Sequence, residues 1–101
     1  MRVTKTDDEL AKQLWALGDV VRLRLLALLP QTAECCEGMN VSQLAEKLEM
    51  SQPTVSHHLR ILRQAGIIES TKQCRDVYYY VNVEEAQMVL DSLSSAFLEK
   101  A

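Results

Sequence analysis

The chain has no hydrophobic run that approaches the length of a membrane span. Its first residues, MRVTKTDDEL, contain no apolar segment like that of a secretory signal peptide. It also lacks a Gly-rich phosphate loop, paired acids in a plausible cleft and a nucleophile with a positioned base. These absences predict a cytoplasmic protein with no membrane partner, and they argue against an enzyme.

Length and composition are typical of one small globular domain. The chain has 101 residues, of which 48% are hydrophobic and 25% are charged. It contains no repeats, no low-complexity segments and no linker long enough to separate two domains. We therefore expect a single domain over residues 1–101 with one modest core.

The most informative stretch is residues 41–67, with the sequence VSQLAEKLEMSQPTVSHHLRILRQAGI. It predicts two helices joined by a very short turn. Ser51 can cap the second helix, Pro53 is tolerated in its first turn, and Gly66 can end it. This is a helix-turn-helix over about residues 42–65, in which the second helix is the presumed reading helix.

The presumed reading helix has one apolar and one polar face. Val55, Leu59 and Leu62 recur at helical spacing. The opposite face carries short or polar side chains and no carboxylate, which suits phosphate oxygens and base edges. Its members are Pro53, Ser56, His57, Arg60 and Gln64, with Gln52 at the edge. The alternative is an ordinary solvated surface.

The net charge of −3 does not exclude a nucleic-acid partner, because the charges are unevenly distributed. Residues 51–75 contain four cationic side chains and only one carboxylate, that of Glu69. Binding depends on the field within about 8 to 10 Å, so this local excess matters more than the total.

The remaining segments predict a mainly α fold with a small β-hairpin, in the order α-α-α-α-β-β-α. Residues 7–17 form a first helix, and Asp19 can cap the next. Residues 20–29 are apolar on nearly every side apart from Arg22 and Arg24, so we expect this helix in the centre of the domain. Residues 67–82 alternate around a polar tip as in a hairpin, and residues 84–99 form a last amphipathic helix.

The two terminal helices each carry an apolar stripe, although a small domain has only one core to share. We expect residues 7–17 and 84–99 to pack at least partly against a second copy of the chain. A two-fold homodimer would present two reading helices to a palindromic site, about one duplex turn apart. The alternative is that both stripes fold back on the monomer.

The segment SQPTVSHHLRILRQAGI, preceded by LGDVVRLRLLALL and followed by VYYYV, resembles the ArsR/SmtB family of winged-helix repressors over about residues 8–99. The resemblance implies a dimer that leaves operator DNA when a metal ion, metalloid or oxidant binds. The DNA contacts it implies are Ser51, Gln52, Thr54, Ser56, His57 and Arg60 on the reading helix, and Lys72 and Arg75 on the wing. Two positions depart from the family pattern, because Glu49 and Cys74 stand where glycine is common.

The sequence leaves several interpretations open for the effector and its binding site. The Cys-x-Cys pair of the family would fall at about residues 40–42 and is absent, and residues 84–99 contain no histidine for a zinc-like site. Cys35 and Cys36, and more weakly Cys74, remain as thiol ligands for arsenite or another soft metal ion. The same thiols could instead sense oxidants, or have no role. DNA binding itself would need no cofactor. An outer helix that docks a protein instead of operator DNA is a further alternative.

Overall fold

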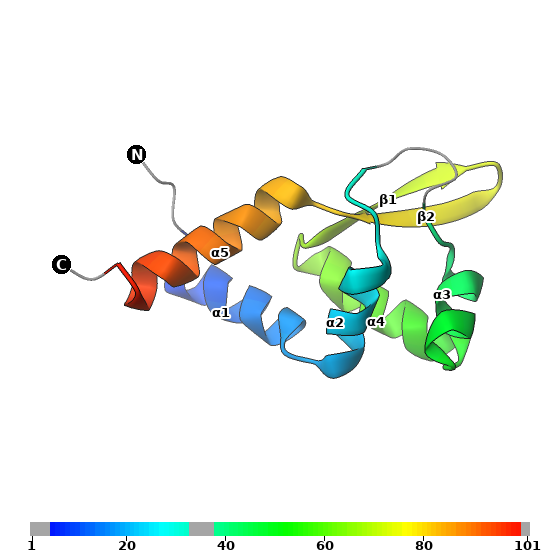
Figure 1. Cartoon of the computed structure of the whole chain (residues 1–101), viewed down its shortest axis with the longest axis horizontal. Helices are drawn as coiled ribbons and strands as arrows, with labels where there is room; N and C mark the ends of the chain where they lie inside the picture. The colour runs from blue at the N-terminus through cyan, green and yellow to red at the C-terminus, as the bar shows by residue number, and fades with distance from the viewer. Residues whose placement is uncertain (1–4, 33–37, 100–101) are drawn as a thin grey trace.

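A computed structural model describes residues 5–32 and 38–99 of the chain (Figure 1). Cys35 and Cys36 lie outside the described residues. The elements are α1 (Asp7–Leu17), α2 (Val20–Leu28), α3 (Val41–Leu48), α4 (Gln52–Gln64), β1 (Ile68–Gln73), β2 (Asp76–Val81) and α5 (Val83–Phe97). Their order confirms the mainly α fold with one antiparallel hairpin. None of the described helices is long and apolar enough to cross a membrane.

Side-chain caps set the start of each helix. Asp19 Oδ1 accepts from the backbone N–H groups of Val21 and Arg22 at the start of α2. Ser51 Oγ accepts from the N–H of Thr54 at the start of α4, 3.3 Å away, as its sequence position predicts. At the other end of α4, Gly66 adopts a φ of 80°, which ends the helix and turns the chain into β1.

The apolar stripe of α4 forms the middle of the core. Val55, Leu59 and Leu62 are buried in one cluster with Leu25 of α2 and Leu44 of α3. The cluster also contains the first residues of the hairpin and part of α5, namely Ile67, Ile68 and Val89. Because α4 is held by this stripe, its opposite face is left at the surface.

Helix α2 packs against α1, α3 and α4, as its expected central position requires, but it is not buried on all sides. Val20 and Leu23 are 62% and 54% exposed, whereas Arg22 is buried. The Arg22 guanidinium lies 3.9 Å from Asp19 Oδ2 and stacks 5.0 Å from the centre of the Trp15 ring. A carboxylate partner and an aromatic face make the burial of this charge tolerable, while only Leu25 of the helix interior is fully buried.

Two turns use left-handed backbone at residues other than glycine. Cys74 and Arg75 form the two-residue tip of the hairpin, with φ values of 51° and 74°. Such a pair gives the turn a twist that matches the paired strands, in which Gln73 faces Asp76. Glu49, at the carboxyl end of α3, has a φ of 55°. The two positions that depart from the family pattern therefore both adopt conformations that favour glycine.

We expect Glu49→Gly to stabilise the fold by about 1 kcal/mol, because glycine removes the steric cost of the left-handed backbone. Urea unfolding monitored by circular dichroism measures this change. Glu46→Gly is the matched control, since Glu46 is exposed inside α3 and glycine there should cost about 1 kcal/mol. Equal destabilisation by both substitutions would contradict the prediction.

Candidate nucleic-acid interface

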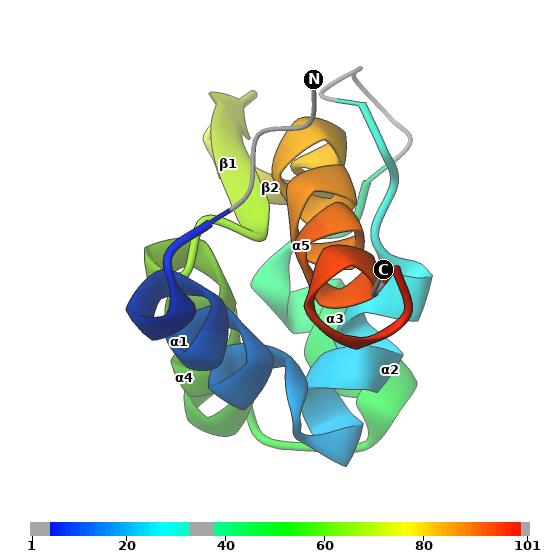
Figure 2. The same cartoon turned by 90° about the vertical axis from the view of Figure 1, so that its left-hand side faces the viewer.

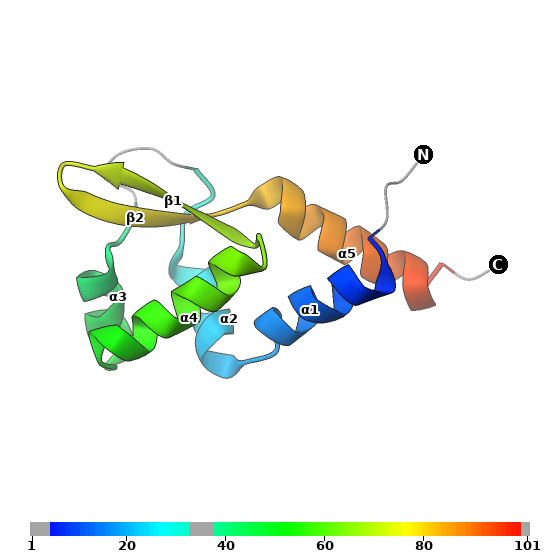
Figure 3. The same cartoon turned by 180° about the vertical axis from the view of Figure 1, so that it is seen from behind.

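The outer face of α4 is accessible along its whole length (Figure 3). His57, Arg60 and Gln64 are exposed, and Ser56 is half-buried. The first turn is also exposed, including Gln52, Pro53 and Thr54. The reading-helix residues named from the sequence are thus all at least partly exposed, and α4 contains no carboxylate.

The amino-terminal turn of α4 is held by two hydroxyl groups. Ser51 Oγ and Thr54 Oγ1 lie 2.8 Å apart, so that one donates to the other. Both hydroxyls are therefore engaged in the cap while still lying at the surface. The amino end of a helix also carries a partial positive charge, which favours a nearby phosphate.

The two adjacent histidines play different structural parts. His57 is exposed, whereas the His58 side chain is only 14% exposed and its Nδ1 lies 4.0 Å from Asp19 Oδ1. Their ring centroids are 5.7 Å apart at an angle of 63°. His58 therefore packs α4 against the start of α2, whereas His57 lies at the surface and lines a hollow with Lys12 and Trp15 of α1.

The hairpin adds a second exposed basic group. Lys72 and Arg75 are exposed at or beside its tip, as is Cys74. Figure 3 shows the hairpin above α4 on the same side of the molecule. Cys74 thus lies at the wing tip, and no group of three potential metal ligands occurs among the residues that the structure describes.

A cleft of about 480 Å³ lies beside α4, where Tyr79 of the hairpin folds over the helix. Its lining residues are Ser56, Leu59, Arg60, Arg63 and Gln64 from α4 and Tyr79 from β2. Sequence reasoning did not place Arg63 among the candidate contacts. Its position seven residues after Ser56 and three after Arg60 was the available signal, because this spacing puts all three on one side of a helix.

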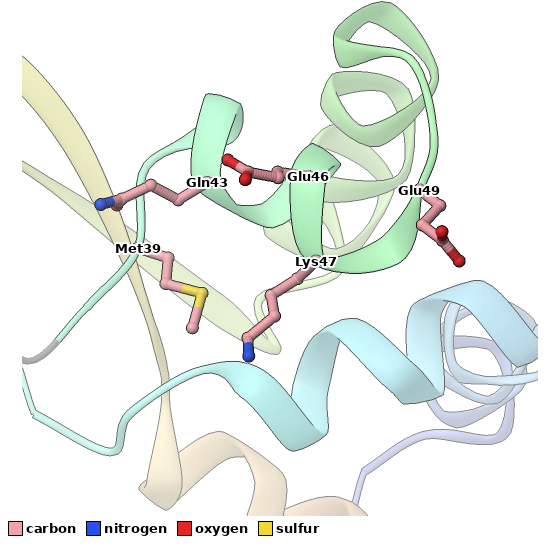
Figure 4. A pocket seen from close by; sticks show the side chains of 5 residues that line it. All are labelled: Met39, Gln43, Glu46, Lys47 and Glu49. Carbon is pink, nitrogen blue, oxygen red and sulfur yellow. The ribbon is translucent and has the colours of Figure 1, made fainter.

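A second hollow, of about 500 Å³, lies beside α3 (Figure 4). Met39 and Lys47 point toward the same space, whereas the carboxylates of Glu46 and Glu49 point in different directions. Because these groups do not converge on one point, the hollow has no donor set for a metal ion.

A polar bridge connects α4 to the two terminal helices. Gln13 Nε2 of α1 donates to the carbonyl oxygen of Ala65, 3.0 Å away, and to Glu85 Oε1 of α5, 2.7 Å away. Glu85 Oε1 also pairs with the Lys5 ammonium. The hydrogen bonds from Lys5 and Gln13 hold the pKa of Glu85 below its ordinary value. The bridge fixes the carboxyl end of α4 relative to α1 and α5.

We expect Glu85→Gln to lower the free energy of unfolding at pH 7 by roughly 1–2 kcal/mol, since a charged acceptor is lost. A lowered pKa in the folded state means that the stabilisation is present above the unfolded value of about 4.5 and is lost as the pH falls through the folded value. The difference between variant and wild type should therefore shrink in acid. Thermal unfolding between pH 3 and 7 measures it. Glu84→Gln, at an exposed neighbour, should show no such trend.

The described residues Pro30 and Gly38, on the two sides of the segment that contains Cys35 and Cys36, both lie against strand β2. Before the segment, the carbonyl oxygen of Pro30 accepts from the N–H of Val81, 2.8 Å away. After it, Gly38 lies against Tyr78, where an added Cβ would be 3.6 Å from the tyrosine Cβ. Both residues that flank the segment are therefore in contact with the hairpin.

The terminal helices leave apolar side chains at the surface. Figure 2 looks at the end of the molecule where α1 and α5 lie side by side. On α5, Leu90 and Phe97 are 60% and 59% exposed, and Trp15 of α1 is 66% exposed. An apolar hollow lies at the same helices, lined by Leu17, Leu26, Ile67, Val81, Ala86, Val89 and Leu90. Within the described residues, apolar side chains on both α1 and α5 are therefore left uncovered.

Comparison with known proteins connects this geometry to transcription regulators. The family model of bacterial regulatory proteins of the arsR family matches residues 19–70. An HTH-type transcriptional regulator of Methanocaldococcus jannaschii is 37% identical over 81 residues, which are 77% of this chain and 86% of that protein. The arsenic resistance transcriptional regulator of Pseudomonas putida is 38% identical over 73 residues, which are 72% of this chain and 54% of that protein.

A solved structure agrees with the fold. An ArsR-like transcriptional regulator from Rhodococcus sp. RHA1 superposes with a TM-score of 0.77 at 28% identity, covering 91% of this chain and 82% of that one. The architecture is thus a winged helix, in which the β1–β2 hairpin is the wing and α3 and α4 form the helix-turn-helix. These relatives are regulators and not enzymes. The chain belongs to the ArsR family of DNA-binding bacterial regulatory proteins.

Proposed function

We propose that this regulator is a repressor that occupies operator DNA as a homodimer and leaves it when an effector binds. The observation that carries the proposal is the exposed, carboxylate-free face of α4 beside a wing with two exposed cations. The proposed DNA contacts are Ser51, Gln52, Thr54, Ser56, His57, Arg60 and Gln64 from α4 and its cap, and Lys72 and Arg75 from the wing. A partner of this kind would place the protein in the cytoplasm.

The dimer would use α1 and α5. Uncovered apolar side chains on both helices, and the apolar hollow that α5 lines together with Leu17, Leu26 and the base of the hairpin, favour a second copy as the cover. A two-fold dimer presents the same α4 face twice, so that each protomer would occupy one half of a palindromic operator. The polar bridge from Gln13 and Glu85 would fix each α4 relative to this interface.

The effector would be a thiophilic metal ion or metalloid, such as arsenite, held by Cys35 and Cys36. Soft thiolates prefer such centres, and a similar protein from Pseudomonas putida is named for arsenic resistance. The hydrogen bond from Val81 to Pro30 and the packing of Gly38 against Tyr78 support a coupling between these thiols and the wing. Cys74 is a poorer ligand because it lies at the exposed wing tip. Oxidation of the same pair by peroxide is the alternative effector chemistry.

Fluorescence anisotropy tests the proposal with labelled duplexes taken from the DNA upstream of the gene that encodes this chain. We expect tight binding that weakens steeply with salt and exceeds binding to a scrambled duplex of equal length. Titration with arsenite, antimonite, cadmium, zinc and peroxide should then identify the effector as the compound that releases the DNA. Equal affinity for upstream and scrambled duplexes would instead favour a winged helix that docks a protein.

A further inference from the structure

We propose that a hollow between α1 and α4, here called the Trp15 hollow, is a binding site for a small aromatic carboxylate. Its volume is about 410 Å³. The lining residues are Lys12, Trp15 and Ala16 from α1, His57, Ile61 and Gln64 from α4, and Ala65 directly after α4. Binding at this site is independent of the proposed function, and only its effect on DNA affinity rests on operator binding.

The apolar part of the Trp15 hollow suits an aromatic ring. Helices α1 and α4 lie side by side (Figures 2 and 3). Ala16 between them is 1% exposed, and Ile61 and Ala65 are half-buried. Trp15 adds an indole that is 66% exposed. A ring bound against these groups would remove apolar surface from water, and paired aromatic rings attract each other beyond the area that they bury.

The charges at the Trp15 hollow favour an anion. Lys12 is exposed three residues before Trp15, a spacing that places both side chains on one face of α1. Lys12 has no ion-pair partner within residues 5–32 and 38–99, and no lining residue is acidic. The Arg22 guanidinium already lies 5.0 Å from the centre of the Trp15 ring. Both charges would repel a cationic ligand and attract a carboxylate.

The Trp15 hollow is separate from the surface that we assign to the dimer. The apolar hollow beside α5 and the Trp15 hollow share no lining residue. The apolar hollow has no charged lining residue, whereas the Trp15 hollow presents the Lys12 ammonium. In a two-fold contact centred on the Trp15 hollow, the Lys12 side chains of both copies would face each other. A small anion therefore fits this hollow better than a second copy of the chain does.

The Trp15 hollow also borders the proposed operator surface. His57 and Gln64 line it from α4, and both are among the proposed DNA contacts. A carboxylate bound beside them would place a negative charge where the DNA phosphates approach, so that repulsion and lost contacts would both weaken operator binding. The ligand would thus be a second effector, with a site that does not include Cys35 or Cys36.

The single tryptophan of the chain is the reporter for this site, because Trp15 lines the hollow. The probe is 3-phenylpropionate, which is transparent where tryptophan is excited. We expect a saturable change in Trp15 emission at about millimolar concentrations or below. Two analogues of similar size are compared with it: 3-cyclohexylpropionate lacks the aromatic ring, and 3-phenylpropylammonium reverses the charge. Each should bind at least about 3-fold more weakly.

Substitutions at exposed positions test the two main contacts. Lys12→Gln should weaken probe binding by about 3-fold. Lys47→Gln is the matched control, because it removes the same charge from an exposed position on α3, and it should leave binding unchanged. Saturation-transfer NMR measures binding to the variants without tryptophan. Trp15→Phe should keep most of the affinity because it keeps an aromatic face, whereas Trp15→Leu should lose it. Circular dichroism confirms that each variant is folded.

Three results would overturn the carboxylate site, whether or not the chain binds DNA. The first is the absence of a saturable emission change with 3-phenylpropionate. The second is equal binding of 3-phenylpropionate and 3-phenylpropylammonium. The third is a Trp15 emission that changes with protein concentration in parallel with dimer formation, because a second copy would then cover the hollow.

Anisotropy of a preformed operator complex tests the regulatory effect. We expect 3-phenylpropionate to release DNA from the wild type and from Cys35→Ser/Cys36→Ser, but not from Trp15→Leu. Release that persists in Trp15→Leu would show that the probe acts elsewhere and would overturn this effect. A wild-type chain that ignores every duplex defeats the proposed function itself, and the emission titration still decides whether the site binds its ligand.

Discussion

Replacing Leu90 and Phe97 together by lysine is expected to convert the proposed homodimer into a monomer that binds operator DNA at least 100-fold more weakly. Both side chains are more than half exposed on α5 and neither belongs to the buried core, so we expect the protomer to stay folded when they are replaced. A charge at the centre of an apolar interface is costly to bury without a partner. Linking two half-site contacts typically raises affinity by about 10² to 10⁴, and the monomer would lose that gain.

Lysine is the informative substitution here because added positive charge favours DNA. A fall in affinity can therefore not be ascribed to repulsion from the phosphates. Sedimentation velocity measures the mass of the variant, and anisotropy measures its affinity for a full operator and for a single half-site. The half-site affinity should be nearly unchanged.

Gln87→Lys is the control on the same helix, at an exposed polar position that bonds Asp91. It should remain dimeric and retain operator affinity. A Leu90→Lys/Phe97→Lys variant that still sediments as a dimer would show that α5 is not the interface. A stable monomer with wild-type affinity would show that dimerisation is irrelevant to DNA binding.

The second large effect is expected at the thiols. The double variant Cys35→Ser/Cys36→Ser should bind operator DNA within about 2-fold of the wild type yet no longer be released by arsenite. Serine is close in size to cysteine but gives a much poorer ligand for a soft centre, because its hydroxyl stays protonated at neutral pH. Anisotropy during an arsenite titration of a preformed complex measures the release.

Cys74→Ser serves as the control for this experiment, because its thiol is exposed at the wing tip. It should respond to arsenite as the wild type does. A double variant that is still released at wild-type arsenite concentrations would remove Cys35 and Cys36 from the sensing site. A wild-type complex that responds to peroxide and to no metal would favour the oxidation of the pair over coordination.

The element order was predictable because its signals are local. A cap such as Ser51 and the spacing of Val55, Leu59 and Leu62 lie within a few residues of the structure they define. The burial of α2 was not predictable in the same way. Its apolar residues look alike in the sequence, and only their neighbours in space decide that Leu25 is buried while Leu23 is exposed.

In the candidate site too, features that depend on one helix were predictable and features that depend on contacts between distant segments were not. A helical wheel is enough to separate His57 from the core, because that separation depends on α4 alone. The grouping of Arg63 with Tyr79 depends on how the hairpin folds back over α4, and no periodicity within either segment reports it. The effector remains the least predictable part, since adjacent cysteines have no spacing that distinguishes one soft ligand from another.

The attachment of Pro30 and Gly38 to strand β2 has an evolutionary consequence. Because Pro30 is hydrogen-bonded to β2 and Gly38 packs against it, we expect that the residues between them can be exchanged while α3 and α4 keep their places. The effector that is sensed and the operator sequence that is recognised would then change independently during evolution. Chimaeras that carry a foreign stretch between residues 30 and 38 should recognise the same operator while answering to a new signal.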